Sequence, residues 1–144
     1  MKQGRFYQNR LGIAGWLKAG NYSIARYLYT LQRLSGVGLI IFLLLHIIET
    51  KSRIQGGAAW EATMGALETP LFIFFEWVVM IGFIFHAVNG IRLVLIEFGV
   101  GLGKPGRPIF PYEHSIRRQR PLMWGLMMVV VLLGVISIFD FFVW

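Results

Sequence analysis

Residues 37–48 read VGLIIFLLLHII, a run whose only polar side chain is His46. With its neighbours this run forms a segment, 27–49, that has the roughly 20 mostly apolar residues needed to cross a bilayer as a helix. Two further segments, 70–98 and 121–144, meet the same requirement. The sequence therefore predicts an all-α integral membrane protein with three transmembrane helices.

The composition agrees with a membrane location. Of the 144 residues, 56% are hydrophobic and 15% are charged, whereas soluble domains carry about 25% charged residues. We expect a basic N-terminal segment, 1–26, followed by one transmembrane domain, 27–144. The absence of cysteine excludes disulfides, thiolate zinc sites and cysteine-ligated iron–sulfur clusters in this chain. No nucleic-acid partner is predicted, because the basic residues that give the net charge of +7 flank the apolar runs.

The basic residues also predict an orientation. Segment 1–26 has five Lys and Arg residues and no acid, and the loop 99–120 has five against Glu113 alone. The loop 50–69 balances two basic residues with two acidic ones. Because Lys and Arg accumulate in cytoplasmic flanks, we expect the N-terminus and the 99–120 loop to be cytoplasmic. The C-terminus then lies on the outer side of a cell or inner membrane.

Polar side chains inside a span are costly, so each needs a structural or functional reason. His86 lies well inside the second span, with Gly82 and Gly90 one turn away on the same helix face. Two interpretations fit this stripe. It is a packing surface whose histidine bonds to a neighbouring helix, or a groove in which a flat macrocycle lies against the backbone. The third span has Asp140 as its only charge and is assigned to packing.

Two motifs carry a resemblance to a known family. The second span contains HAVNGIRLVLIEF at 86–98, and the first contains LQRLSGVGL at 31–39. Together they resemble the large cytochrome b membrane anchor of succinate:quinone oxidoreductase, the succinate dehydrogenase and fumarate reductase enzymes of respiratory complex II. The matching residues are Arg33, Ser35, Gly36, His86, Gly90, Ile91, Arg92, Glu97 and Phe98. This sequence departs from the family pattern at Tyr29, Gln32, Leu93 and Glu97, where serine, histidine, histidine and aspartate are usual.

The resemblance implies an assembly. The three helices would be half of a helical bundle that a second, small membrane anchor completes. An iron–sulfur subunit and a flavoprotein subunit would hold the chemistry of the tricarboxylic acid cycle reaction. This chain would have no dicarboxylate or flavin site, and would pass electrons between the iron–sulfur subunit and the quinone pool. The reaction direction and any trimerisation are left open.

The resemblance also implies haem b. His86 would be an axial ligand of the haem iron, with Arg33 or Arg92 at a propionate. His46 is 13 residues outward from Arg33, and His86 is 6 residues outward from Arg92. At 1.5 Å per residue, and with the two arginines at similar depth, the imidazoles differ by about 10 Å. The second axial ligand is therefore expected from the other membrane anchor. His46 either ligates a second haem or is an interfacial histidine.

For the quinone, ubiquinone or menaquinone, the resemblance implies a site at the cytoplasmic end of the first span. Ser35 would donate to a quinone carbonyl, and Arg33 would stabilise its developing negative charge. Tyr29, one turn before Arg33, is a further candidate. Two rival functions remain: a cytochrome b subunit of another respiratory dehydrogenase, such as a hydrogenase or formate dehydrogenase, and a haem-free membrane scaffold.

Overall fold

The computed structural model describes residues 14–17, 20, 22–103 and 118–143, and within them it contains helices and no strand. The α-helices are α1 (Ala14–Leu17), α2 (Ile24–Thr50), α3 (Gly57–Leu67), α4 (Pro70–Glu97) and α5 (Arg120–Phe142), with a 3-10 helix η1 (Lys51–Gln55) after α2. Three helical segments are long and apolar enough to cross a membrane: Ile24–Gln55, Pro70–Glu97 and Arg120–Phe142. The prediction of an all-α protein with three transmembrane helices is thereby confirmed.

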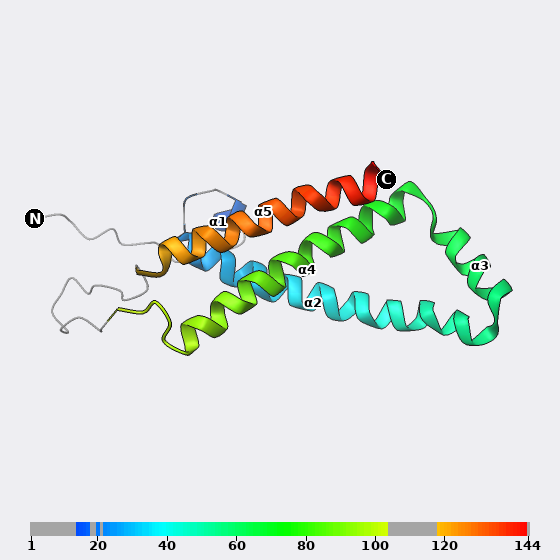
Figure 1. Cartoon of the computed structure of the whole chain (residues 1–144), viewed down its shortest axis with the longest axis horizontal. Helices are drawn as coiled ribbons and strands as arrows, with labels where there is room; N and C mark the ends of the chain where they lie inside the picture. Colours follow the sequence, from blue (N-terminus) through cyan, green and yellow to red (C-terminus); the bar gives the residue numbers. More distant parts are fainter. Residues whose placement is uncertain (1–13, 18–19, 21, 104–117, 144) are drawn as a thin grey trace, which may run out of the picture.

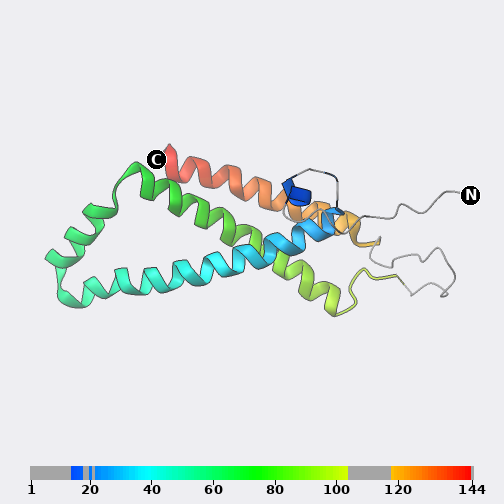
Figure 2. The ribbon, with the colours of Figure 1, turned by 180° about the vertical axis from the view of Figure 1, so that it is seen from behind.

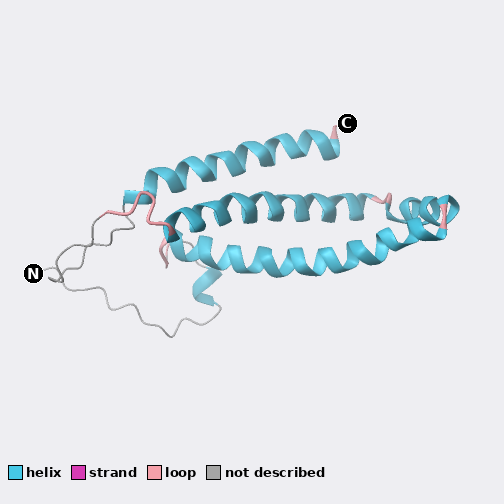
Figure 3. Ribbon diagram, turned by 60° about the horizontal axis from the view of Figure 1, so that its bottom comes forward, coloured by secondary structure: helices cyan, strands magenta, loops and turns pink. Residues whose placement is uncertain are grey.

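Helix α4 is the centre of the molecule and contacts both α2 and α5. The start of α2, the end of α4 and the start of α5 lie at one end of the molecule, and α3 lies at the other (Figures 1 and 2). Helices α2 and α4 diverge toward α3, which closes the wide end (Figure 1). A view along a different direction shows the three long helices running side by side (Figure 3).

Local chemistry explains the bounds of α4. Thr69 stands before the helix in an extended conformation, and its side chain accepts a hydrogen bond from the Phe72 backbone N–H. Pro70 occupies the first turn, where its missing N–H leaves no helical hydrogen bond unmade. At the other end Gly99 adopts a φ of 76°. Its N–H donates to the Ile96 carbonyl, and the Val100 N–H donates to the Leu95 carbonyl, the Schellman arrangement that ends many helices.

The sequence missed α3. The segment 50–69 was predicted only as a loop, but η1 and α3 occupy most of it. Gly56, with a φ of 104°, separates the two helices in a conformation that only glycine adopts readily. The Arg53 guanidinium carbon lies 4.3 Å from the centre of a Trp60 ring, a cation–π contact that ties η1 to α3. The predicted segment 1–26 lies largely outside the described residues, as does 104–117 of the predicted 99–120 loop.

The distribution of polar and apolar side chains is reversed relative to a soluble protein. Among the described residues, the buried hydrophobic side chains are Leu28 and Met123, and the buried polar ones are Asn89, Arg92, Gln119 and Ser137. Large apolar side chains cover the outside of all three long helices. Such a surface suits lipid or a partner helix. The buried Asn89, Arg92 and Ser137 each make a hydrogen bond to a neighbouring side chain.

Small and polar residues join α4 to α5. The Trp77 indole N–H donates to the Ser137 hydroxyl at 3.1 Å, and this hydroxyl donates to the Gly134 carbonyl at 2.8 Å. A Cβ added to Gly134 would lie 3.3 Å from Cδ1 of Ile81, so the Ile81 side chain packs directly on this glycine. Trp77 also packs edge-on against Phe142, with ring centres 5.7 Å apart.

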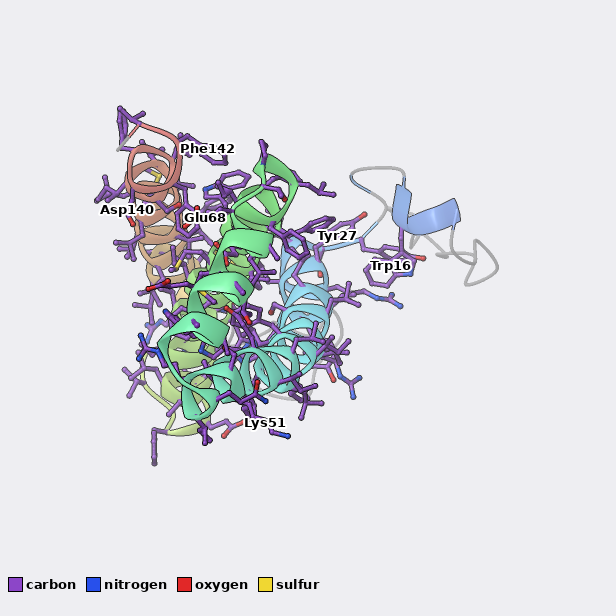
Figure 4. All side chains as sticks on the ribbon, turned by 90° about the vertical axis from the view of Figure 1, so that its right-hand side faces the viewer. Trp16, Tyr27, Lys51, Glu68, Asp140 and Phe142 are labelled. Carbon is purple, nitrogen blue, oxygen red and sulfur yellow. The ribbon has the colours of Figure 1, made fainter. Side chains whose placement is uncertain are left out.

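An aromatic cluster lies at the opposite end, where α2 begins. Trp16 of α1 stacks at a tilt on Tyr22 and meets Tyr27 edge-on, with ring centres 4.7 and 5.6 Å apart. The Arg26 guanidinium carbon lies 4.3 Å from the centre of the Tyr22 ring. Figure 4 shows Trp16 of α1 on the side of α2 where Tyr27 lies, away from α4 and α5. Aromatic side chains at this level suit a membrane–water interface.

Candidate functional site: a histidine-centred polar chain between α2 and α4

The His86 ring lies against the backbone of α2 where α2 and α4 meet. A Cβ added to Gly36 would be 3.0 Å from Cε1 of this ring. A contact of this length is unusually tight, so any other residue here would require the ring to shift by a few tenths of an ångström. The neighbouring Ser35 hydroxyl oxygen is 3.1 Å from His86 Nδ1, and the Gln32 carbonyl oxygen is 3.2 Å from the same nitrogen. Gln32, Ser35 and Gly36 of the first span thus form one wall of the histidine site.

These contacts assign the tautomer of His86. The Ser35 hydroxyl donates its hydrogen to the Gln32 carbonyl at 3.1 Å. Its oxygen is then an acceptor, as the Gln32 carbonyl always is. Both neighbours of Nδ1 therefore require a proton on Nδ1, and the lone pair is left on Nε2. No hydrogen bond to Nε2 comes from any residue that the structure describes, so this nitrogen is free to bind another group.

Gln32 holds His86 from two directions. Its backbone carbonyl accepts from the imidazole, and its side-chain Nε2 donates to the His86 backbone carbonyl at 3.1 Å. A Cβ added to Gly90 would lie 3.4 Å from the Gln32 Nε2 atom, an ordinary contact that brings the amide close to α4. The two residues thus clamp α2 and α4 together at this level.

The chain of polar contacts continues to Asn89 and Arg92. Asn89 Nδ2 donates to Gln32 Oε1 at 2.9 Å, and Arg92 Nε donates to Asn89 Oδ1 at 2.9 Å. Asn89 is 0% exposed and Arg92 is 4% exposed. No carboxylate among the described residues lies within ion-pair distance of Arg92. A buried guanidinium without an anion is costly, so its place between the helices suits an anionic group from outside this chain.

Arg33 and Tyr29 lie apart from this chain of contacts. Both are exposed, and the Arg33 guanidinium carbon is 5.4 Å from the centre of the Tyr29 ring. The predicted quinone residues therefore divide between two faces of α2: Ser35 faces His86, while Arg33 and Tyr29 face outward. The 100° turn per residue of a helix separates Arg33 from Ser35 in this way.

His46 occupies the outer half of α2, far from His86. Its side chain is 49% exposed, its Nδ1 is 3.6 Å from a Glu49 carboxylate oxygen, and its ring stacks on Phe42. Because His86 lies level with Gly36, His46 is ten residues further along α2, roughly 15 Å at 1.5 Å per residue. The sequence estimate of about 10 Å assumed that Arg33 and Arg92 lie at similar depth, whereas His86 lies beside the residues directly after Arg33.

The sequence singled out His86, Ser35 and Arg92 and missed the link between them. Gln32 was noted only as a departure from the family pattern, and Asn89 was included only as part of the second-span motif. The three-residue spacing of His86, Asn89 and Arg92 was the available signal, because it puts all three toward one side of α4. Of the two glycines predicted to flank His86, Gly90 meets Gln32, while an added Cβ on Gly82 would meet nothing within 4 Å.

Comparison with known proteins supports the resemblance. The chain matches the family model of the succinate dehydrogenase/fumarate reductase transmembrane subunit over residues 13–136. The succinate dehydrogenase 2 membrane subunit SdhC of Mycobacterium tuberculosis is 27% identical over 104 residues, which are 72% of this chain and 67% of that protein. The succinate dehydrogenase cytochrome b558 subunit of Bacillus subtilis is 33% identical over 101 residues, 68% of this chain.

The chain spans 50% of the length of the Bacillus protein. A third relative, the succinate dehydrogenase hydrophobic membrane anchor subunit of Halobacterium salinarum, is 28% identical over 91 residues, 62% of this chain and 70% of that protein. The family model covers α2 and α4, most of α5, and both motifs of the polar site. The chain therefore belongs to the succinate dehydrogenase/fumarate reductase transmembrane subunit family, as the sequence motifs predicted.

Proposed function

We propose that this chain is the cytochrome b membrane anchor of a succinate:quinone oxidoreductase, with a b-type haem on His86. The observation that carries the proposal is the His86 ring itself. Its Nδ1–H donates to the backbone carbonyl of Gln32, and its Nε2 lone pair is free. Histidines that bind a metal nearly always donate their other N–H to a carbonyl or carboxylate in this way. The related Bacillus protein is named a cytochrome b558 subunit.

The surrounding residues fit a haem. Gly36 leaves room for the imidazole to lie against α2, and the buried Arg92 guanidinium offers charge-assisted hydrogen bonds to a propionate. Haem supplies a one-electron carrier between the iron–sulfur subunit and the quinone. His46 is too far along α2 to complete the coordination on the other face. The second axial histidine therefore comes from the second small anchor subunit, which also completes the helical bundle.

We place the quinone contact at Arg33 and Tyr29. Both lie exposed near the end of α2 that carries the basic N-terminal segment, where we expect the soluble iron–sulfur subunit to dock. A guanidinium stabilises the negative charge that develops on a quinone carbonyl oxygen, and a phenol donates a proton to it. The Ser35 hydroxyl already gives its hydrogen to Gln32, so in this proposal it supports His86 instead.

The test is a reduced-minus-oxidised absorption spectrum with haem quantitation on the complex purified through this subunit. We expect a b-type signal in the wild type that His86→Ala abolishes, together with a co-purifying flavoprotein. His46→Ala is the matched variant on the same bundle: full retention of haem assigns one haem to this chain, and loss of half of it assigns a second. A colourless wild-type complex would overturn the haem proposal, and the further absence of a flavoprotein would favour a scaffold.

A further inference from the structure

Gln32, which is half-buried, and Asn89, which is buried, form a hydrogen-bonded pair of carboxamides between α2 and α4. The Asn89 side chain is wholly buried, and both of its polar atoms are bonded, Nδ2 to Gln32 and Oδ1 to Arg92. Burying an amide without hydrogen bonds costs roughly 2–7 kcal/mol, depending on the reference state. Leucine, of similar size, would pack here at no such cost. Two fully bonded amides therefore need a reason beyond packing.

The two ends of this hydrogen-bonded series determine which way each amide faces. Arg92 can only donate and the His86 backbone carbonyl can only accept. Asn89 must therefore turn its oxygen to Arg92 and its nitrogen to Gln32, and Gln32 must turn its nitrogen to His86. Reversing either amide would place two donors or two acceptors face to face. The amide orientations follow from the network itself, and each amide locks the next.

We propose that Gln32 and Asn89 are positioning residues that hold the Arg92 guanidinium at a fixed place relative to His86 and thereby set the reduction potential of the haem. The inference rests on the proposed haem at His86. A fixed cation beside a haem favours the reduced form, which carries one positive charge less. Without the Asn89 oxygen, the Arg92 Nε–H has no partner among the described residues, and the guanidinium is free to turn away toward water and lipid headgroups.

Asn89→Leu is the first variant, because it removes both hydrogen bonds and keeps the volume. Potentiometric titration of haem absorbance in the purified complex should show full haem content with a lower potential. We expect the equilibrium constant for haem reduction to fall about tenfold, equal to about 59 mV for one electron. Gln32→Leu should also lower the haem reduction potential. It should also change the electron paramagnetic resonance spectrum of the ferric haem, because the His86 backbone loses its clamp.

The double variant shows whether Gln32 and Asn89 act through one hydrogen-bonded path or have two independent effects on the potential. If one chain acts, Gln32→Leu with Asn89→Leu shifts the potential about as much as the larger single variant, since either change interrupts the same path. Ser137→Ala is the matched control: it removes another buried hydrogen bond of α4, the one to Trp77, and should leave the potential unchanged.

The outcomes separate this inference from the proposed function. A wild-type complex without haem overturns both. The inference is wrong if Asn89→Leu has the same haem potential as the wild type, or if Ser137→Ala shifts that potential equally. The proposed haem on His86 stands in either case. If Asn89→Leu does not assemble, Asn89→Ala, which only removes atoms, is judged by the same potential shift. Loss of haem from both variants in an assembled complex also contradicts positioning, because His86 should keep its iron.

Discussion

Single residues decide the geometry of the histidine site, and Gly36 is the clearest case. The imidazole lies against this glycine, and a Cβ at this position would be 3.0 Å from its Cε1 atom. The ring cannot give way easily, because Nδ1 is bonded to Ser35 and Gln32 on the same helix. A methyl group at this position must therefore displace the ring from its hydrogen bonds.

We predict that Gly36→Ala lowers haem affinity about tenfold. This is the lower end of the loss in affinity that substitutions next to a metal ligand typically cause. Haem content per assembled complex, measured after dilution in detergent, checks this. Gly38→Ala is the control, because it adds the same methyl group two residues later on α2, where nothing lies within 4 Å. Equal haem retention in the two variants would contradict the placement of His86 against Gly36.

At the level of helices, two different kinds of contact hold the bundle together. Helices α2 and α4 meet through the polar chain from Ser35 to Arg92, and α4 and α5 meet through small residues and the Trp77–Ser137 hydrogen bond. Hydrophobic association does not favour one helix pair over another in lipid, so close packing and interhelical hydrogen bonds carry the specificity. The α4–α5 contact can be measured separately, because it involves no site residue.

A double-mutant cycle of Trp77→Phe and Ser137→Ala should give a coupling energy of about 0.6 kcal/mol, the average for such bonds in a membrane. Reversible unfolding in mixed detergent micelles measures the free energy of unfolding for each variant. Both single variants should keep the haem spectrum of the wild type. Additive effects of the two substitutions would show that the indole N–H and the hydroxyl do not bond to each other.

For the whole molecule, the arrangement implies a polarity across the membrane. The end that carries the start of α2 and the end of α4 adjoins the basic segments, and the other end carries α3 (Figure 1). In this fold the three helices alternate in direction, so α3 and the end of α5 share a side. From the charge distribution we predict that this side faces outward.

Single introduced cysteines test this topology without background labelling of this chain, which has none of its own. An impermeant maleimide applied to intact cells should label Ser52→Cys, at the α3 end, and leave Gly103→Cys, after α4, unlabelled. Inverted vesicles should give the opposite pattern. Labelling of both positions from one side would contradict three crossings, and exchange of the two patterns would invert the predicted orientation.

Hydropathy along the chain was sufficient to predict three membrane-spanning helices. The two motifs predicted the family, and His86 was predicted as the centre of the site. Helix α3 was missed because its Gly- and Ala-rich sequence, GAAWEATMGAL, is too short and too weakly patterned to stand out from a loop. A helix of this length is marginal alone and depends on tertiary contacts, such as the stacking of Arg53 on Trp60.

The role of Gln32 and Asn89 could not be predicted from the sequence, although Gln32 was noted as a departure from the family pattern. Span length and mean polarity are sums over neighbouring residues, so both can be calculated from the sequence without any tertiary structure. The pairing of Gln32 with Asn89 depends instead on how far α4 is shifted and rotated against α2, and a displacement of one residue turns a side chain by 100°. Hydrophobic segments and motifs follow from residue order. The link from His86 to Arg92 exists only because two separate helices lock in one register, with Gly36 and Gly90 allowing the close approach.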